Sequence, residues 1–376
     1  MSTITCPQFC EMDSEIIEDF SECLRENVEA IESCLSLLDE EQSPNQDLVH
    51  RLFRDIHSLK GNCRMVFLDP LVETIHSLEE IVSEMRQEKR NYHPAYGEFF
   101  MSTIVHLESM IDALLREGEV NDGQQTKIMG LIKTILAAET GKDVDALNQA
   151  LILLSASSHS NEDDFTSQPE NKQTSLQAPK SETEEDLAFF KKLSLQLDGL
   201  NPSRTERTQT ILDLCLSTNN DMGKIVDIEQ LTAAVYMHDF GMALVPYEIL
   251  AKPTKLNAKE VERIHNHVGI GAQLLHRMKG WDEAAEIVLQ HHEHYNGRGY
   301  PLKISGGNIH PGAMIIALAD TFYAVTNERV DRSDKKSLFS AVTLINGESG
   351  EQFDPKFVEA FNETVRRNYI ARRNKS

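Results

Sequence analysis

The chain has 376 residues, of which 40% are hydrophobic and 26% are charged, and its formal net charge is −23. This length predicts two or three domains of ordinary globular composition. The acidic balance argues against general nucleic-acid binding, because no excess of Lys and Arg is available to neutralise phosphates. The C-terminal stretch "VRRNYIARRNKS" is basic. We interpret it as a solvated helix end in preference to a membrane or nucleic-acid contact.

The cysteines and the apolar runs indicate in which cellular compartment the protein is expected. Six cysteines are present, none of them in a close C-x-x-C pair, and no secretory signal opens the chain. Apolar runs such as "MIIALA" at 314–319 are far too short to cross a bilayer. We therefore expect a reduced, cytoplasmic protein without a membrane span.

In chain order, residues 14–118 have apolar residues spaced by three and four, which predicts helices. Residues 125–155 predict one or two more helices. The following stretch is rich in Ser, Glu, Gln and Asn and poor in apolar residues, which predicts a flexible linker. Helical patterning returns from about 187 to 370, broken by one Gly/Pro-rich stretch. No alternating apolar run is long enough to matter, so we predict an all-α fold with two globular parts.

The segment "LVHRLFRDIHSLKGNC" places a histidine on an exposed helix face. Its apolar residues form one stripe, whereas His57, Lys60 and Gly61 share another face. A lysine one turn on can stabilise a phosphoryl group carried by the imidazole, and a glycine lets a partner protein approach closely. That glycine costs about 1 kcal/mol of helix stability relative to alanine, so a functional reason is worth seeking.

A second half of this motif follows in "LVETIHSLEEIV", which contains His76 and Glu79. If the two helices pack as an antiparallel pair, Glu79 can bond one ring nitrogen of His57. That bond would fix the tautomer and leave the other nitrogen free to attack phosphorus.

The two segments together resemble the histidine phosphotransfer (HPt) domain, of the type that opens chemotaxis histidine kinases. The resemblance implies that His57 is the phosphoacceptor and that the other motif residues support it: Lys60, Gly61, His76 and Glu79. The sequence lacks a kinase ATP-binding region, so His57 would receive phosphate from another protein. The alternative is a helical bundle in which His57 is merely exposed.

The C-terminal part holds a denser set of histidines and aspartates in helix-like segments. Imidazole and carboxylate together suit iron, manganese, zinc or nickel. A single histidine on a helix is more often structural, whereas six candidates that include two adjacent pairs favour a metal site. Six ligands suit two ions bridged by one carboxylate, for which Asp239 is the candidate. The set comprises His238, Asp239, His267, His291, His292 and Asp320.

The loop after His292 carries "HYNGRGYPLKISGG", in which glycines permit a tight turn and Tyr-Pro stiffens it: Gly297, Gly299, Tyr300 and Pro301. Residues 200–362 resemble the HD-GYP family, a branch of the HD metal-dependent phosphohydrolases. The resemblance implies an all-helical fold and cleavage of cyclic di-GMP to pGpG or GMP. It also implies that the six residues hold two divalent ions, iron or manganese.

The family binds substrate phosphate through basic residues after the last aspartate, and Arg329 and Arg332 stand in those places. An arginine fork suits a phosphate. The alternative for these two residues is a solvated charged turn.

The sequence departs from the family pattern in three places. Arg204 or Asn201 stands where an early H-x-x-R segment has its histidine. If Arg204 is the aligned position, Leu200 stands where a third metal would need a glutamate. We therefore predict no third metal. Tyr323 replaces an aspartate that often follows the last ligand, and Met242 replaces the lysine of H-D-x-G-K.

The missing lysine bears on the rate of catalysis. Losing one electrostatic donor at such a site costs about 3–4 kcal/mol, or about 10²–10³ in rate. The six expected ligands are all present, so we predict a slow enzyme over an inert one.

These observations predict a two-component signalling protein with four segments. They are an HPt domain at 10–118, a helical extension at 119–155, a disordered linker at 156–186 and an HD-GYP domain at 187–370. The expected partners are a response-regulator receiver domain or histidine kinase, cyclic di-GMP and a GGDEF-domain protein. One alternative is a catalytically degenerate domain that binds cyclic di-GMP or a protein while the HPt domain relays phosphate. Another is catalysis on a different cyclic dinucleotide or a nucleotide monophosphate.

Overall fold

The computed structural model describes residues 3–40, 45–138, 144, 146–148, 150–151, 182–199, 207–250, 252, 254–327 and 337–370. The fold is all-α, as the sequence predicts, with one small sheet. The chain divides into two compact units, the first formed chiefly by residues 1–171 and the second chiefly by residues 172–341 and 348–365.

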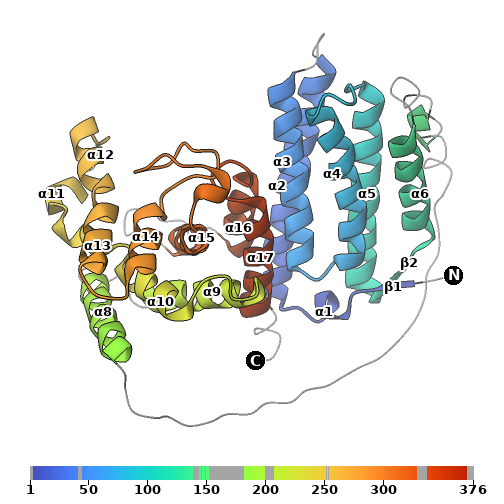
Figure 1. Ribbon diagram of the computed structural model, residues 1–376. Coiled ribbons are helices and arrows are strands. Elements are labelled where there is room, and N and C mark those ends of the chain that lie inside the picture. The colour runs from blue at the N-terminus through green and yellow to red at the C-terminus, as the bar shows by residue number, and fades with distance from the viewer. Residues whose placement is uncertain are drawn as a thin grey trace. The chain divides into compact units, whose positions relative to one another are not determined.

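The first unit is a helical bundle in which α2, α3, α4 and α5 run lengthwise beside one another (Figure 1). Its elements are β1 (Thr3–Thr5), α1 (Pro7–Cys10), α2 (Ser14–Glu40), α3 (Gln46–Met65), α4 (Asp69–Arg86), α5 (Pro94–Glu117), β2 (Glu119–Asn121) and α6 (Gly123–Ala137).

The pair α3–α4 positions the phosphotransfer motif. Asn45 caps α3, because its side-chain oxygen accepts from the backbone N–H groups of Asp47 and Leu48. The chain reverses between the helices at Phe67, whose φ is 60°, and Pro70 lies in the first turn of α4, where a missing N–H costs nothing. The short connection makes the two helices antiparallel neighbours, which is the condition for the expected contact between Glu79 and His57.

A two-stranded sheet closes the end of the bundle, and the sequence did not predict it. β1 pairs antiparallel with β2, with Thr3 opposite Asn121 and Thr5 opposite Glu119. Three residues per strand are too few to show an alternating apolar pattern. β2 and α6 lie in the predicted helical extension, and α6 packs on α4 through a stripe that includes Ile128, Ile132 and Ile135.

The C-terminal part is a set of shorter helices. They are α8 (Glu182–Asp198), α9 (Arg207–Asp221), α10 (Ile228–Met237), η2 (Phe240–Leu244), α11 (Tyr247–Leu250), α12 (Ala258–His265), α13 (His267–His276), α14 (Asp282–Gln290), η3 (Gly306–Asn308), α15 (Pro311–Thr326), α16 (Leu338–Gly347), α17 (Pro355–Val365) and η4 (Arg366–Ile370).

The core of the second unit brings helix ends together. α10 packs on α9 and α14, and α15 packs on α9 and α14 (Figure 1). The residues directly after α10, at the start of α13 and directly after α14 are histidines. Side chains at helix ends are held by the packed helices behind them, so this arrangement can fix several ligands around one point.

One predicted boundary needs correction. The sequence assigns 156–186 to a disordered linker, but residues 182–186 form the start of α8, where Asp186 accepts a hydrogen bond from Trp281 Nε1 at 2.8 Å. The run of acidic residues there gave no apolar pattern from which to predict a helix. Residues 156–181 lie outside the described residues. Among the described helices, none combines the length and apolar character needed to cross a membrane.

Candidate functional sites

The phosphotransfer motif forms one hydrogen-bonded cluster between α3 and α4. Nδ1 of His57 lies 2.5 Å from Oε1 of Glu79, and Lys60 Nζ donates to Oε2 of the same carboxylate at 2.5 Å. Nδ1 of His76 lies 3.0 Å from that oxygen, with the side chain more than half exposed. Gly61 follows Lys60 on α3 and is buried. The contact between Glu79 and His57 is the one that an antiparallel pair predicts.

The charge on Glu79 decides the tautomer of His57. Burial raises the pKa of Glu79, but the hydrogen bond from His57 and the positive charge of Lys60 outweigh it and lower this pKa to about 2. A carboxylate can only accept hydrogen bonds, so Nδ1 of His57 carries the proton that Glu79 receives. The lone pair is thereby placed on Nε2, the nitrogen that points away from Glu79. The side chain is one-fifth exposed, so a partner can reach the ring.

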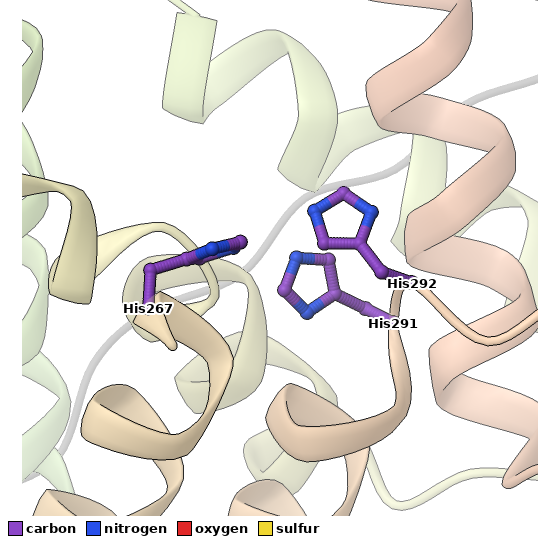
Figure 2. Close-up of side chains that lie close together, drawn as sticks. All are labelled: His267, His291 and His292. Carbon is purple, nitrogen blue, oxygen red and sulfur yellow. The ribbon is translucent and has the colours of Figure 1, made fainter. Parts of the chain in front are cut away.

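In the second unit, three histidines converge. His267 begins α13, and His291 and His292 follow α14. One ligand atom from each lies within 4.8 Å of the others. Figure 2 shows the three rings turned toward a shared space, with His267 on one side and the adjacent pair on the other.

Backbone carbonyls set the tautomers of the buried histidines. Nδ1 of His238, His267 and His291 donates to the carbonyl oxygen three residues earlier, at 2.7, 2.6 and 2.7 Å respectively. A carbonyl only accepts, so Nδ1 holds the proton and the Nε2 lone pair remains free to bind a metal. Nε2 of His267 and of His291 is buried and has no hydrogen-bond partner among the residues that the structure describes.

The chemistry of this histidine pocket fits a metal ion. A buried nitrogen without a partner costs about 1–3 kcal/mol, which a bound cation would recover. Burial lowers the pKa of His291 well below its usual range, and burial together with the neighbouring His267 lowers the pKa of His292 to about 4. The rings of His291 and His292 are therefore neutral near pH 7, which is the form that binds metal. Asp239 adds a carboxylate, with Oδ1 3.6 Å from His267 Nε2.

The remaining predicted ligands surround an arginine. Nη2 of Arg207, the first residue of α9, lies 2.6 Å from Asp320 Oδ1, 2.9 Å from Asp239 Oδ2 and 3.2 Å from His238 Nε2. Arg207 is buried. Burial raises the pKa of Asp239, but the positive charge of Arg207 outweighs it and holds this pKa well below its usual range.

Sequence reasoning missed Arg207, although a signal for it was present. Arg207 is the fourth residue of the local "RTER" stretch, which matches the arginine of H-x-x-R when Arg204 stands for the histidine.

The Gly-Tyr-Pro loop covers the histidine pocket. The Tyr300 ring stacks between His265, with centroids 3.6 Å apart, and His292, with centroids 4.9 Å apart. Glu293 holds the loop by accepting from the backbone N–H groups of Leu302 and Lys303. A Cβ on Gly299 would collide with the backbone of Glu293, so only glycine lets the loop fold this closely. Gly297 has a φ of 78°, which also favours glycine.

The residues that depart from the family pattern fall in different places. Met242 lies half-buried on η2, where its N–H bonds to the carbonyl of Asp239 at 2.8 Å, and it brings no positive charge. Tyr323 is buried on α15. The remaining predicted positions lie outside the described residues: Leu200, Asn201, Arg204, Arg329 and Arg332.

Comparison with known families agrees with this division. Residues 15–117 match the Hpt domain family, and residues 193–357 match the HD domain family. The chain contains an Hpt domain and an HD domain. The resemblances inferred from the sequence motifs are thereby confirmed.

Curated relatives match the HD domain. A cyclic di-GMP phosphodiesterase of Vibrio cholerae is 36% identical over 141 residues, which is 36% of this chain and 28% of the relative. A cyclic di-GMP phosphodiesterase of Thermotoga maritima is 35% identical over 138 residues, 36% of this chain and 37% of the relative. 3'3'-cGAMP-specific phosphodiesterase 2 of Vibrio cholerae is 33% identical over 141 residues, 35% of this chain and 26% of the relative. The chain thus spans less than two-fifths of each of these relatives.

Proposed function

We propose that the HD domain is a metal-dependent phosphodiesterase that opens cyclic di-GMP to pGpG or GMP. The observation that carries the proposal is the histidine pocket, where three histidines converge and the buried Nε2 atoms of His267 and His291 lack hydrogen-bond partners among the described residues. The relatives named as cyclic di-GMP phosphodiesterases support the substrate.

The chain's own residues have separable tasks in this reaction. His267, His291 and His292 would hold a divalent ion, with Asp239 as the adjoining carboxylate. Such an ion would supply Lewis-acid chemistry, with which a phosphodiester can be hydrolysed near neutral pH. The Tyr300 ring covers His292 and restricts water at that side of the pocket. Arg329 and Arg332 remain the proposed contacts to the substrate phosphates.

The number of ions is a separate question. The sequence predicts two, iron or manganese, held by six residues. The histidine pocket offers a full set of donors for one of them. The other three predicted ligands already contact Arg207.

The Hpt domain would accept a phosphoryl group on Nε2 of His57 from a receiver domain or a histidine kinase. The nitrogen lone pair attacks phosphorus, the bond from phosphorus to the donor group breaks, and the donor leaves with the electron pair. Glu79 holds the Nδ1 proton and balances positive charge that develops on the ring, while Lys60 lies close enough to attract the incoming phosphoryl group. A GGDEF-domain protein is a further proposed partner. The six free thiols support a reduced, cytoplasmic setting.

The alternative is an HD domain that binds cyclic di-GMP or a protein without turnover, leaving the Hpt relay as the output. Met242 favours it, because this residue supplies no cation to the substrate phosphates. The cGAMP-specific relative favours a second variant, in which the reaction is the same and the substrate is a different cyclic dinucleotide.

One experiment separates these functions. The full-length protein, prepared anaerobically and loaded with manganese or iron, is incubated with cyclic di-GMP and in parallel with 3'3'-cGAMP, and products are resolved by chromatography. Formation of pGpG or GMP supports the proposal. Cleavage of 3'3'-cGAMP alone supports the second variant. Saturable binding of cyclic di-GMP by metal-loaded protein that leaves both dinucleotides intact supports the non-enzymatic alternative.

A further inference from the structure

Nη2 of Arg207 lies among three of the six predicted metal ligands. This one nitrogen is within 3.2 Å of His238 Nε2, Asp239 Oδ2 and Asp320 Oδ1. An ion bound to the same three atoms would sit about 2.0–2.2 Å from each of them, in the space that the guanidinium fills. The guanidinium and a second divalent ion therefore exclude each other by volume as well as by charge.

Asp239 separates the two halves of the site. Its Oδ2 contacts Arg207, whereas its Oδ1 faces His267 Nε2. Nδ1 of His238 carries the ring proton and donates it in a hydrogen bond to the Val235 carbonyl. Nε2 of the same ring therefore has a lone pair, which accepts a hydrogen bond from Arg207. By contrast, Nε2 of His267 and of His291 has no such partner within the described parts of the chain. Arg207 therefore supplies the positive charge for one half of the predicted ligand set. The half that contains His267 and His291 has no such cation among the described residues.

Hydrogen bonds at the start of α9 fix the position of Arg207. The next residue, Thr208, donates from its backbone N–H and its hydroxyl to Oδ2 of Asp198, at 3.0 and 2.6 Å. Asp198 ends α8 and so anchors the first turn of α9. A guanidinium keeps its charge at any physiological pH, and a buried one needs carboxylate partners. Asp239 and Asp320 supply them.

We infer that this chain binds one divalent ion, in the pocket of His267, His291, His292 and Asp239, and that Arg207 replaces the second ion. The inference rests on the proposed function, since it assumes that the histidine pocket holds metal. The inference changes the predicted role of three residues from ligands of a second ion to partners of Arg207. They are His238, Asp239 through its Oδ2, and Asp320.

The test is metal stoichiometry of the full-length protein saturated with Mn²⁺, dialysed, and measured by elemental analysis together with electron paramagnetic resonance. Wild type is expected to hold about one ion per chain with the spectrum of an isolated Mn²⁺. Asp320→Asn is expected to keep that ion, whereas His291→Ala is expected to weaken its binding at least about tenfold. Arg207→Gln frees the carboxylates and is expected to raise the content toward two, with a coupled-pair spectrum.

The outcomes distinguish the inference from the function on which it rests. About two ions in wild type, or a coupled-pair spectrum, overturns the inference and leaves the phosphodiesterase proposal standing. No bound metal in wild type overturns both. A folded Arg207→Gln protein that still holds one ion overturns the exclusion by Arg207. If the Arg207→Gln variant does not fold, the Mn²⁺ content of wild type and of Asp320→Asn tests the inference. A two-ion centre would lose an ion on the Asp320→Asn substitution, whereas a one-ion site would not.

Discussion

At the scale of single residues, each domain has a buried charge that fixes the state of its histidines. Glu79 is a carboxylate that receives the Nδ1 proton of His57 and leaves Nε2 as the nucleophile. Arg207 is a cation that donates to the Nε2 lone pair of His238 and pairs with the carboxylates of Asp239 and Asp320. Buried charges of this kind are costly unless they are paired. Removing either one should therefore alter chemistry as well as stability.

Glu79→Gln tests the first of these charges. An amide can still bond to His57 but no longer balances positive charge on the ring, so phosphoryl acceptance is expected to fall by about 10²–10⁴. The measurement is transfer of labelled phosphate from a charged receiver domain to the full-length protein. Glu80→Gln is the matched control, because Glu80 is the exposed neighbour on α4 and should accept phosphate at the wild-type rate. Equal rates for wild type and Glu79→Gln would refute the role of Glu79.

Met242→Lys tests the charge that the HD domain lacks. Met242 bonds through its backbone to Asp239, so a lysine at this position stands beside the proposed metal pocket. A restored electrostatic donor is expected to raise the rate of cyclic di-GMP cleavage by about 10²–10³. The neutral control is Met242→Gln, which should leave the rate near that of wild type. A lysine variant no faster than this control would mean that Met242 does not limit turnover.

At the scale of elements, sequence patterns predicted the helices well and their meeting points less well. The antiparallel pair α3–α4 and its bond between His57 and Glu79 follow from spacing along two amphipathic helices. The convergence of His267, His291 and His292 agrees with the motif spacing.

Other features required the tertiary structure. The strands β1 and β2 are too short to carry a pattern. The start of α8 is acidic, so it resembled the end of the linker. Three of the six predicted ligands contact Arg207 and the other three do not. This difference depends on the tertiary position of the start of α9, which brings Arg207 to Asp239 and Asp320. No periodicity within α9 encodes that encounter.

The Gly-Tyr-Pro loop offers a test at this scale. Gly299→Ala would force a Cβ against the backbone of Glu293, and the loop would have to move away from the histidine pocket. We expect a loss of about 1–3 kcal/mol in the free energy of unfolding. Weaker metal binding should accompany it, because Tyr300 would lose its place against His292. Chemical denaturation and metal titration measure the two effects.

Gly307→Ala is the control for this substitution. A Cβ on Gly307 meets nothing within 4 Å, so stability and metal affinity should both stay close to wild type. If the two alanine variants behave alike, close approach of the loop at Gly299 does not shape the pocket.

At the scale of the whole molecule, one chain carries two sites with unrelated chemistry. The Hpt and HD domains each have a hydrophobic core and a separate set of titratable residues. Domains with their own cores keep their local chemistry when the other is altered. The residues between the two domains, 156–181, were predicted from composition to be a flexible linker and lie outside the described part of the chain.

Two variants of the full-length protein test this independence. His57→Gln is expected to abolish phosphoryl acceptance while metal content stays at the wild-type level. His291→Ala is expected to lose bound metal while phosphoryl acceptance is retained, because the Hpt motif uses none of the HD residues. Elemental analysis and phosphate labelling are applied to both proteins. A variant that loses both properties while keeping its helical circular dichroism would show that the two sites depend on each other.

The most direct test of the central claim is whether turnover of cyclic di-GMP follows occupancy of the histidine pocket. The full-length protein is stripped with a chelator, reloaded stepwise with Mn²⁺ under anaerobic conditions, and assayed by chromatography at each occupancy, with His291→Ala in parallel. We predict that pGpG or GMP forms in proportion to bound metal and that the variant forms at most about a hundredth as much. Wild-type protein with a filled pocket that leaves cyclic di-GMP intact, or one that cleaves it equally after stripping, would contradict the account.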